Sequence, residues 1–209
     1  KERLNKIFPI LEKKFGKPKC ALDFETPYQL MVAVILSAQC TDERVNIVTK
    51  ELFKVVREPQ DIRNMDIKVL EKYIKSTGFY KNKAKNIKLN AEMMLDKYKD
   101  IIPKKLEELI ELPGVGRKTA NVVLSVAFGL PAFAVDTHVE RVSKRLQICK
   151  QSASVLEVEE TLCKKLPKNK WGKAHHWMIF FGRYHCTARS PKCQGCPLLD
   201  LCAYGQKEV

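Results

Sequence analysis

The sequence predicts an all-α fold. Apolar residues recur at the spacing of one helix face, as in Ile67, Leu70, Tyr73 and Ile74, and no comparable run alternates with the period of two that marks a half-buried strand. With 45% apolar residues among 209, the chain can bury a substantial core, which excludes a disordered basic tail. About ten helices joined by short turns are expected.

The helices in the first half of the chain are marked by their apolar residues. Residues 30–36 are apolar on every side, so this helix is expected at the centre of a core. The helix over 65–76 is expected to end at Gly78, because glycine adopts the conformations that terminate helices. Pro103 suits the first turn of a helix over 104–110.

Two later helices are marked by caps at their N-termini. Ser154 and Glu157 have the spacing of a capping box and precede an apolar run. Thr137 and Glu140 have the same spacing and predict a helix over 137–146. No linker rich in Gly, Ser or Pro interrupts these elements, so composition marks no domain boundary.

The charge balance predicts a polyanionic partner. The chain has 38 Lys and Arg against 24 Asp and Glu, a formal net charge of +14. Part of this excess, as at Lys81, Lys83 and Lys85, is expected on a solvated helix face. The longest uncharged stretches, 26–41 and 119–135, are too short or too broken for the roughly 20 apolar residues of a membrane span. The first twenty residues lack the apolar core of a signal peptide, so a cytosolic chain is expected.

Four of the eight cysteines lie close together near the end of the chain, at Cys186, Cys193, Cys196 and Cys202. In a chain of this length, cysteines indicate a metal site or free thiols rather than a disulfide framework. Four thiolates match the ligand count of a zinc site or of a [4Fe-4S] cluster. Structural zinc usually shows two closely spaced pairs, whereas here one CxxC is flanked by single cysteines, which favours iron and sulfur.

Basic residues accompany the cysteine segment. Arg183, Arg189 and Lys192 flank it or lie within it. A metal centre would hold such a loop in shape, and its positive charge suits contact with DNA phosphates better than electron transfer.

A glycine turn between two helices predicts a hairpin that binds phosphate. Gly114 and Gly116 in LPGVGRKTA permit tight backbone conformations. The amides of Val115, Arg117 and Lys118 stand at the start of a helix over 117–128, where they can bind an anion. A helix, a GxG turn and a second helix that begins with a basic residue form the helix-hairpin-helix device for holding a DNA phosphate. The alternative is an ordinary turn between helices, since glycine is common there.

Lys118 is a candidate amine nucleophile. It lies in the first turn of a helix whose positive end disfavours an ammonium, and it shares an apolar face with Val115 and Val122. Both effects favour the neutral amine that acts as a nucleophile. The alternative is a solvated lysine that binds phosphate.

Asp136 is a candidate partner for that amine. The helix over 117–128 is about 17 Å long and residues 129–135 span up to roughly 23 Å, so the chain can return to the end where Lys118 lies. If Thr137 caps the next helix, the Asp136 carboxylate is available to assist deprotonation or to stabilise a sugar cation. The alternative is that Asp136 is itself the helix cap.

Four motifs in a fixed order carry a family resemblance. They read ILSAQCTD, LPGVGRKTANVV, AVDTHVERV and the four-cysteine segment C-x6-C-x2-C-x5-C. In these motifs the chain resembles the bacterial endonuclease III family, DNA glycosylases with lyase activity in the helix-hairpin-helix superfamily. The resemblance implies two helical domains with a cleft between them. One is a six-helix barrel over 21–131, and the other combines 1–20 and 132–209 and holds a [4Fe-4S] cluster.

The resemblance also implies roles for single residues. Lys118 resembles the nucleophile that attacks C1′ of the damaged nucleotide and forms a Schiff base, after which β-elimination cuts the strand. Asp136 resembles the carboxylate that activates the lysine and steadies the cationic sugar. Gln39 resembles the residue inserted in place of the lost base. Phe79 and Tyr80 occupy a second intercalating loop where the family usually has Leu beside Tyr, and the alternative for Phe79 is a core aromatic.

The remaining expectations concern DNA contacts and partners. His138 is expected to line the cleft or to contact phosphate, whereas His175 and His176 lack metal spacing and are expected to be structural. The implied partner is double-stranded DNA with oxidised pyrimidines or abasic sites, bound by a monomer in the bacterial cytoplasm and nucleoid. Each neutralised phosphate releases counterions, so affinity should fall steeply with salt.

Three alternatives to a base-excising lyase are open. An adenine-DNA glycosylase shares the hairpin and the cluster but lacks the lysine found at Lys118. A non-catalytic iron-sulfur DNA-binding module would bind DNA without an activity to lose. An electron carrier would leave the hairpin and the basic charge without a role.

Overall fold

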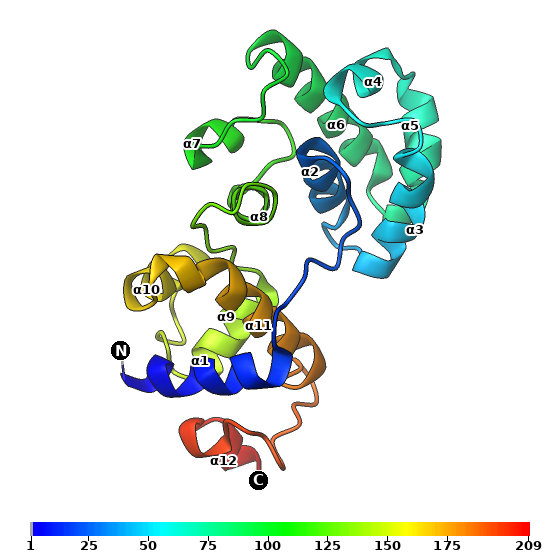
Figure 1. The fold of residues 1–209 in the computed structure, drawn as a ribbon. Coiled ribbons are helices and arrows are strands. Elements are labelled where there is room, and N and C mark those ends of the chain that lie inside the picture. The colour runs from blue at the N-terminus through cyan, green and yellow to red at the C-terminus, as the bar shows by residue number, and fades with distance from the viewer. Residues whose placement is uncertain (1) are drawn as a thin grey trace. The chain divides into compact units, whose positions relative to one another are not determined.

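The computed structural model describes residues 2–209, and every regular element in that range is a helix, which confirms the all-α prediction (Figure 1). Contacts divide the chain into two compact units. The central unit is Cys20–Leu130, and the terminal unit combines the chain up to Lys19 with Pro131–Val209. Within the described range, no helix combines the length and the apolar character needed to cross a bilayer.

The central unit is built around one helix, α2 (Pro27–Leu36). All of its residues from Tyr28 onward are buried, as expected for 30–36, and a capping box between Thr26 and Gln29 opens it. It contacts α3, α6, α8 and η2. The other elements of this unit are α3 (Asp42–Leu52), α4 (Pro59–Asn64), α5 (Ile67–Ile74), η1 (Lys75–Thr77), α6 (Tyr80–Asp96), α7 (Leu106–Leu109), α8 (Arg117–Val122) and η2 (Val123–Ala127).

Three predicted segments of the central unit differ in detail from the structure. The helix expected over 65–76 is α5 followed by the 3-10 turn η1, and Gly78 ends it with φ 73°. The helix expected over 104–110 is only the single turn of α7, which Lys105 precedes, so Pro103 lies outside it. The helix expected over 117–128 begins as α8 and continues with the π-helical hydrogen bonds of η2.

The terminal unit brings the two ends of the chain together (Figure 1). Helix α1 (Glu2–Phe15) packs on α11 (Trp171–Tyr184), and α11 also packs on α9 (Thr137–Arg145). The other elements are α10 (Val155–Lys165), η3 (Lys168–Lys170), η4 (Leu199–Leu201) and α12 (Gly205–Glu208). Ser154 and Glu157 form the predicted capping box at the start of α10.

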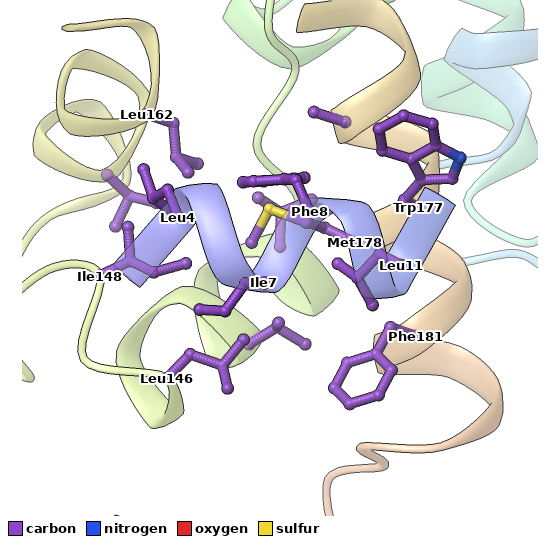
Figure 2. Packing of buried hydrophobic residues seen from close by; sticks show 14 of the residues in the cluster. Leu4, Ile7, Phe8, Leu11, Leu146, Ile148, Leu162, Trp177, Met178 and Phe181 are labelled. Carbon is purple, nitrogen blue, oxygen red and sulfur yellow. The ribbon is translucent and has the colours of Figure 1, made fainter. Parts of the chain in front are cut away.

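The core of the terminal unit forms around one face of α1. Leu4, Ile7, Phe8 and Leu11 follow the i, i+3, i+4, i+7 spacing of a helix face and are at most 4% exposed. Figure 2 shows these side chains among Leu146 and Ile148, Leu162 of α10, and Trp177, Met178 and Phe181 of α11. The indole nitrogen of Trp177 donates to the carbonyl of Gly16, 2.9 Å away, so the end of α1 is held to α11 by both packing and a hydrogen bond.

Candidate functional site

The two glycines of the predicted hairpin have different structural roles. Gly114 has φ 78°, and a Cβ there would lie 3.0 Å from the Cβ of Asn86, so both the backbone and the packing require glycine. Gly116 has an ordinary extended conformation, φ −86° and ψ 175°, and a Cβ there would meet nothing within 4 Å. The fold therefore explains Gly114 and leaves Gly116 without a steric reason to be glycine.

The first turn of α8 carries the amides that the sequence assigned to an anion. Gly116 is the N-cap and has no side chain with which to cap these donors. The Val115 amide, in contrast, donates to the Leu112 carbonyl at 3.0 Å, because it closes the turn that precedes the helix. The Val115 amide therefore already has an acceptor within the turn.

Lys118 is half-buried in that first turn. The residues that follow it, from Thr119 to Val122, are all buried. Its ammonium lies near the thiol of Cys20. Burial raises the pKa of Cys20, and the positive charge of Lys118 opposes that rise. Lys118 therefore combines a partly apolar setting with access to solvent.

Asp136 caps helix α9. Its Oδ1 accepts hydrogen bonds from the amides of His138 and Val139, both at 2.9 Å. The capping box predicted from Thr137 is wrong, because Thr137 already has the helical conformation of the first turn and Glu140 pairs instead with Lys144. Both capping bonds use one carboxylate oxygen, and within residues 2–209 no hydrogen bond to Oδ2 is found.

The two predicted DNA-inserting loops have exposed tips in strained conformations. Gln39 has φ 53° and Phe79 has φ 48°, in the left-handed region that non-glycine residues rarely occupy. Phe79 is 68% exposed, so the alternative of a core aromatic is wrong. Tyr80, half-buried, is the first residue of α6.

One lysine of α6 does not lie on a solvated face. Lys81 and Lys85 are exposed as expected, but Lys83 is 5% exposed. Its Nζ donates to the carbonyls of Leu36 and Thr77, both at 2.8 Å, and burial lowers its pKa. The signal that would have found it is its spacing, because Ile87 follows at i+4 and is also buried.

Three histidines make their side-chain polar contacts with other residues of the terminal unit. His138 Nδ1 lies 3.2 Å from Arg141 Nη2 on the same helix. Nδ1 of His175 lies 2.7 Å from the Ala134 carbonyl, and Nδ1 of His176 lies 2.8 Å from the Gly172 carbonyl. These contacts agree with a structural role for His175 and His176.

The four clustered cysteines line one cavity. Cys186, Cys193, Cys196 and Cys202 surround it together with apolar side chains that include Leu146, Phe181 and Leu198. None of the eight cysteines, all of which lie in the described range, forms a disulfide. Among residues 2–209, no three His, Cys, Asp or Glu side chains are arranged to hold a single metal ion.

The cavity fits an iron-sulfur cluster on chemical grounds. Burial raises the pKa values of Cys193 and Cys196, and the neighbouring thiols of the set raise them further, so four thiolates together need a cationic centre. His185 also lines the cavity, and its Nε2 is buried without a hydrogen-bond partner in the described chain. The sulfides of a cluster would supply an acceptor there.

Two arginines of α9, which the sequence did not identify, hold the cysteine segment. Arg145 donates to the Thr187 and Ala188 carbonyls at 2.6 and 2.9 Å and to the Cys186 sulfur at 3.3 Å. Arg141 donates to the carbonyls of Gly182 and Cys186. Asp136 and these arginines share one helix, so the cap and the cysteine segment are rigidly linked.

The predicted basic DNA contacts lie around the same segment. Arg189 and Lys192 are exposed, and Arg183 is half-buried near the end of α11. The backbone amide of Lys192 donates to the carbonyl of His185 at 3.0 Å, which fixes the loop beside the first cysteine. The side chain of Lys192 therefore projects from an ordered backbone.

Two known family models match this chain, one over most of its length and one over the cysteine segment. Residues 32–168 match the family described as HhH-GPD superfamily base excision DNA repair protein. Residues 186–202 match the iron-sulfur binding domain of endonuclease III, and this range begins and ends at cysteines that line the cavity. The cofactor is a [4Fe-4S] cluster.

Individual relatives agree with the family matches over nearly their whole length. The endonuclease III of Bacillus subtilis is 57% identical over 92% of this chain and 88% of its own length. That of Escherichia coli is 42% identical over 96% and 95%.

Solved structures agree as well. A trapped endonuclease III-DNA covalent intermediate is 54% identical, with a TM-score of 0.96 over 99% of this chain and 97% of that one. A thermostable thymine-DNA glycosylase, 24% identical with a TM-score of 0.83, shares the fold. The chain belongs to the endonuclease III family of helix-hairpin-helix base excision repair enzymes.

Proposed function

We propose that this chain excises oxidised pyrimidines from DNA through a Schiff base on Lys118 and then cuts the strand by β-elimination. It is a DNA glycosylase and abasic-site lyase of base excision repair. The observation that carries the assignment of the nucleophile is the place of Lys118. It is a half-buried amine in the first turn of the hairpin helix, beside the first-turn amides, and the N-cap residue Gly116 makes no side-chain cap hydrogen bond. A phosphate held by those amides would bring the sugar of a neighbouring nucleotide to the amine.

The chemistry requires Lys118 to react as a free amine. Its Nζ attacks C1′ of the damaged nucleotide, and the base departs with the electrons of the glycosidic bond and takes up a proton. The amine loses a proton, and the C1′–O4′ bond then breaks as O4′ takes up a proton, which opens the sugar ring and leaves a protonated imine. Removal of a C2′ proton then expels the 3′-phosphate, and water hydrolyses the imine to regenerate the lysine.

Asp136 is proposed to accept the proton of the amine and to stabilise the cationic sugar. Its Oδ1 is held by two amides of α9, which fixes the orientation of the carboxylate. Oδ2 is the oxygen that would face the reaction. Capping and catalysis are therefore compatible, because each uses a different oxygen of the same carboxylate.

The two compact units are proposed to be the two domains of the family. The central unit would be the six-helix barrel over 21–131, and the terminal unit would be the cluster domain of 1–20 and 132–209. Lys118 belongs to the central unit and Asp136 to the terminal unit. The cluster would be held by Cys186, Cys193, Cys196 and Cys202, where it shapes the basic loop with Arg189 and Lys192.

The DNA contacts are proposed from the exposed tips and the hairpin. Gln39 would fill the gap left by the everted base, and Phe79 with Tyr80 would wedge the opposite strand. The amides of Gly116 and Arg117, with Gly114 shaping the turn, would hold one phosphate. His138 and Arg183 would contact the backbone elsewhere. We also infer a cytoplasmic, nucleoid-associated monomer.

Borohydride trapping tests the proposed nucleophile. Reduction of the imine should give a covalent complex with DNA that contains an oxidised pyrimidine or an abasic site. Lys118→Ala should abolish trapping, and Lys85→Ala, at an exposed lysine of α6, should leave it unchanged. Asp136→Asn should slow base excision, with stability followed separately because Asp136 also caps α9. Undiminished trapping in Lys118→Ala would refute the assignment.

A further inference from the structure

One buried ammonium joins the two loops whose tips are proposed to enter the DNA. Leu36 ends α2, three residues before Gln39, and Thr77 ends η1, two residues before Phe79. The carbonyls of Leu36 and Thr77 both accept a hydrogen bond from Nζ of Lys83, each at 2.8 Å. The two loops are therefore tied to one side chain of α6.

The tips of these loops are strained and need to be held. Gln39 and Phe79 both have positive φ, and Phe79 is 68% exposed, so its own side chain makes little packing that would fix it. A strained backbone persists only where the surrounding structure determines it. The hydrogen bonds of Lys83 lie just before each strained residue, where they can supply that constraint.

Stability alone does not explain a lysine at this position. Lys83 is 5% exposed and is held by two carbonyls. Burying a charge costs free energy, and an apolar side chain of similar length is often as stabilising in such a place. A cation does suit the carbonyls at the end of α2, because they carry the negative end of the helix dipole. An apolar residue cannot donate hydrogen bonds to the carbonyls of two separate segments at once.

We propose that Lys83 is a positioning residue that holds the Gln39 and Phe79 loops at a fixed separation for insertion into DNA. This proposal rests on the proposed function. Base eversion requires unstacking and unpairing, which the inserted side chains offset. Loops that are already ordered lose less conformational entropy when they enter the DNA. Lys83 should therefore matter most in the step that takes a base out of the helix.

Two reactions of the same enzyme separate this role from a general structural one. Excision of an oxidised pyrimidine needs eversion of a paired base, whereas β-elimination at a preformed abasic site starts with no base to remove. In Lys83→Met, the single-turnover rate of excision should fall at least tenfold and the rate of β-elimination less than threefold. Lys85→Met, an exposed lysine of the same helix, is the matched control and should change neither rate.

Hydrogen exchange supplies a readout that does not depend on activity. The amides of 37–41 and 77–81 should exchange at least tenfold faster in Lys83→Met than in the wild type or in Lys85→Met. If Lys83→Met does not fold, Lys83→Gln serves instead. Its side chain is shorter and uncharged, so it should hold the two carbonyls less well than lysine and show the same changes in smaller measure.

Failure of the role proposed for Lys83 can be distinguished from failure of the proposed function. Equal loss of excision and β-elimination, or unchanged exchange in both loops, would overturn the role of Lys83 and leave the proposed function standing. A wild-type protein that neither excises damaged bases nor is trapped on DNA would overturn the proposed function, and the role of Lys83 with it.

Discussion

The two hairpin glycines allow DNA binding by the hairpin to be tested separately from the stability of the fold. The test compares the stability and DNA affinity of two variants, Gly116→Ser and Gly114→Ala. A side chain at Gly116 meets no atom within 4 Å, and its backbone is extended, so serine fits there without strain. The backbone at Gly114 is left-handed, so a residue with a side chain is strained there, and its Cβ would lie 3.0 Å from the Cβ of Asn86.

The structure predicts little change in stability for Gly116→Ser and a clear loss of stability for Gly114→Ala. Serine is a better N-cap than glycine by a few tenths of a kcal/mol, so Gly116→Ser should keep its stability to within about 0.5 kcal/mol. The left-handed conformation costs alanine roughly 1–2 kcal/mol, and Asn86 must also shift, so Gly114→Ala should lose about 1–3 kcal/mol. That corresponds to a fall in Tm of roughly 3–10 °C for a chain of this size.

Gly116→Ser should lose DNA affinity although it keeps its stability. The serine hydroxyl of Gly116→Ser would occupy the approach to the first-turn amides and would compete for them. Loss of one hydrogen bond to a charged phosphate costs roughly 1.5–3 kcal/mol, or about ten- to a hundredfold in Kd. The variant should therefore be stable and bind poorly.

Fluorescence anisotropy at fixed salt, with DNA that carries an uncleavable abasic-site analogue, measures this affinity, and thermal unfolding by circular dichroism measures stability. Wild-type affinity in a fully stable Gly116→Ser would refute the phosphate-binding role of the hairpin. A large loss of stability in that variant would refute the reading of its steric surroundings.

Three further outcomes are expected. Ile7→Ala should lower the free energy of unfolding by about 2–5 kcal/mol, because Ile7 is fully buried, whereas Ile47→Ala at a 59% exposed site should stay within about 0.5 kcal/mol in denaturant titrations. Burial lowers the pKa of His176, so the unfolded chain takes up a proton first as pH falls below about 6.5. Wild-type stability should therefore drop toward acid pH by up to about 1.4 kcal/mol per unit more than that of His176→Gln, and parallel unfolding curves for the two proteins would contradict this. Arg145→Met should lose the bonds to Thr187, Ala188 and Cys186 and bleach its cluster absorbance several-fold faster in air, whereas unchanged bleaching would show that the loop does not need this arginine.

The helices were predictable because their signals are local. The capping box of Ser154 and Glu157 and the apolar run of α2 depend on neighbouring residues, and both appear as expected. The choice of cap at α9 failed because Asp136 and Thr137 are both good N-caps, and the sequence does not say which residue adopts the extended conformation.

The buried polar contacts were not predictable because they join distant segments. Lys83 meets carbonyls from two other elements, and Arg145 meets a loop more than forty residues away. Charged side chains are most often exposed, so a lysine among other lysines reads as surface. Only the apolar spacing of Lys83 with Ile87 hinted otherwise, and it did not name the bonding partners.

The central claim is that Lys118 forms the covalent bond to DNA. The most direct measurement is peptide mapping by mass spectrometry of the borohydride-reduced complex with abasic-site DNA, after nuclease and protease digestion. The deoxyribose adduct should lie on Lys118, with the other lysines and the N-terminal amine unmodified. An adduct on any other amine, with Lys118 unmodified, would contradict the account.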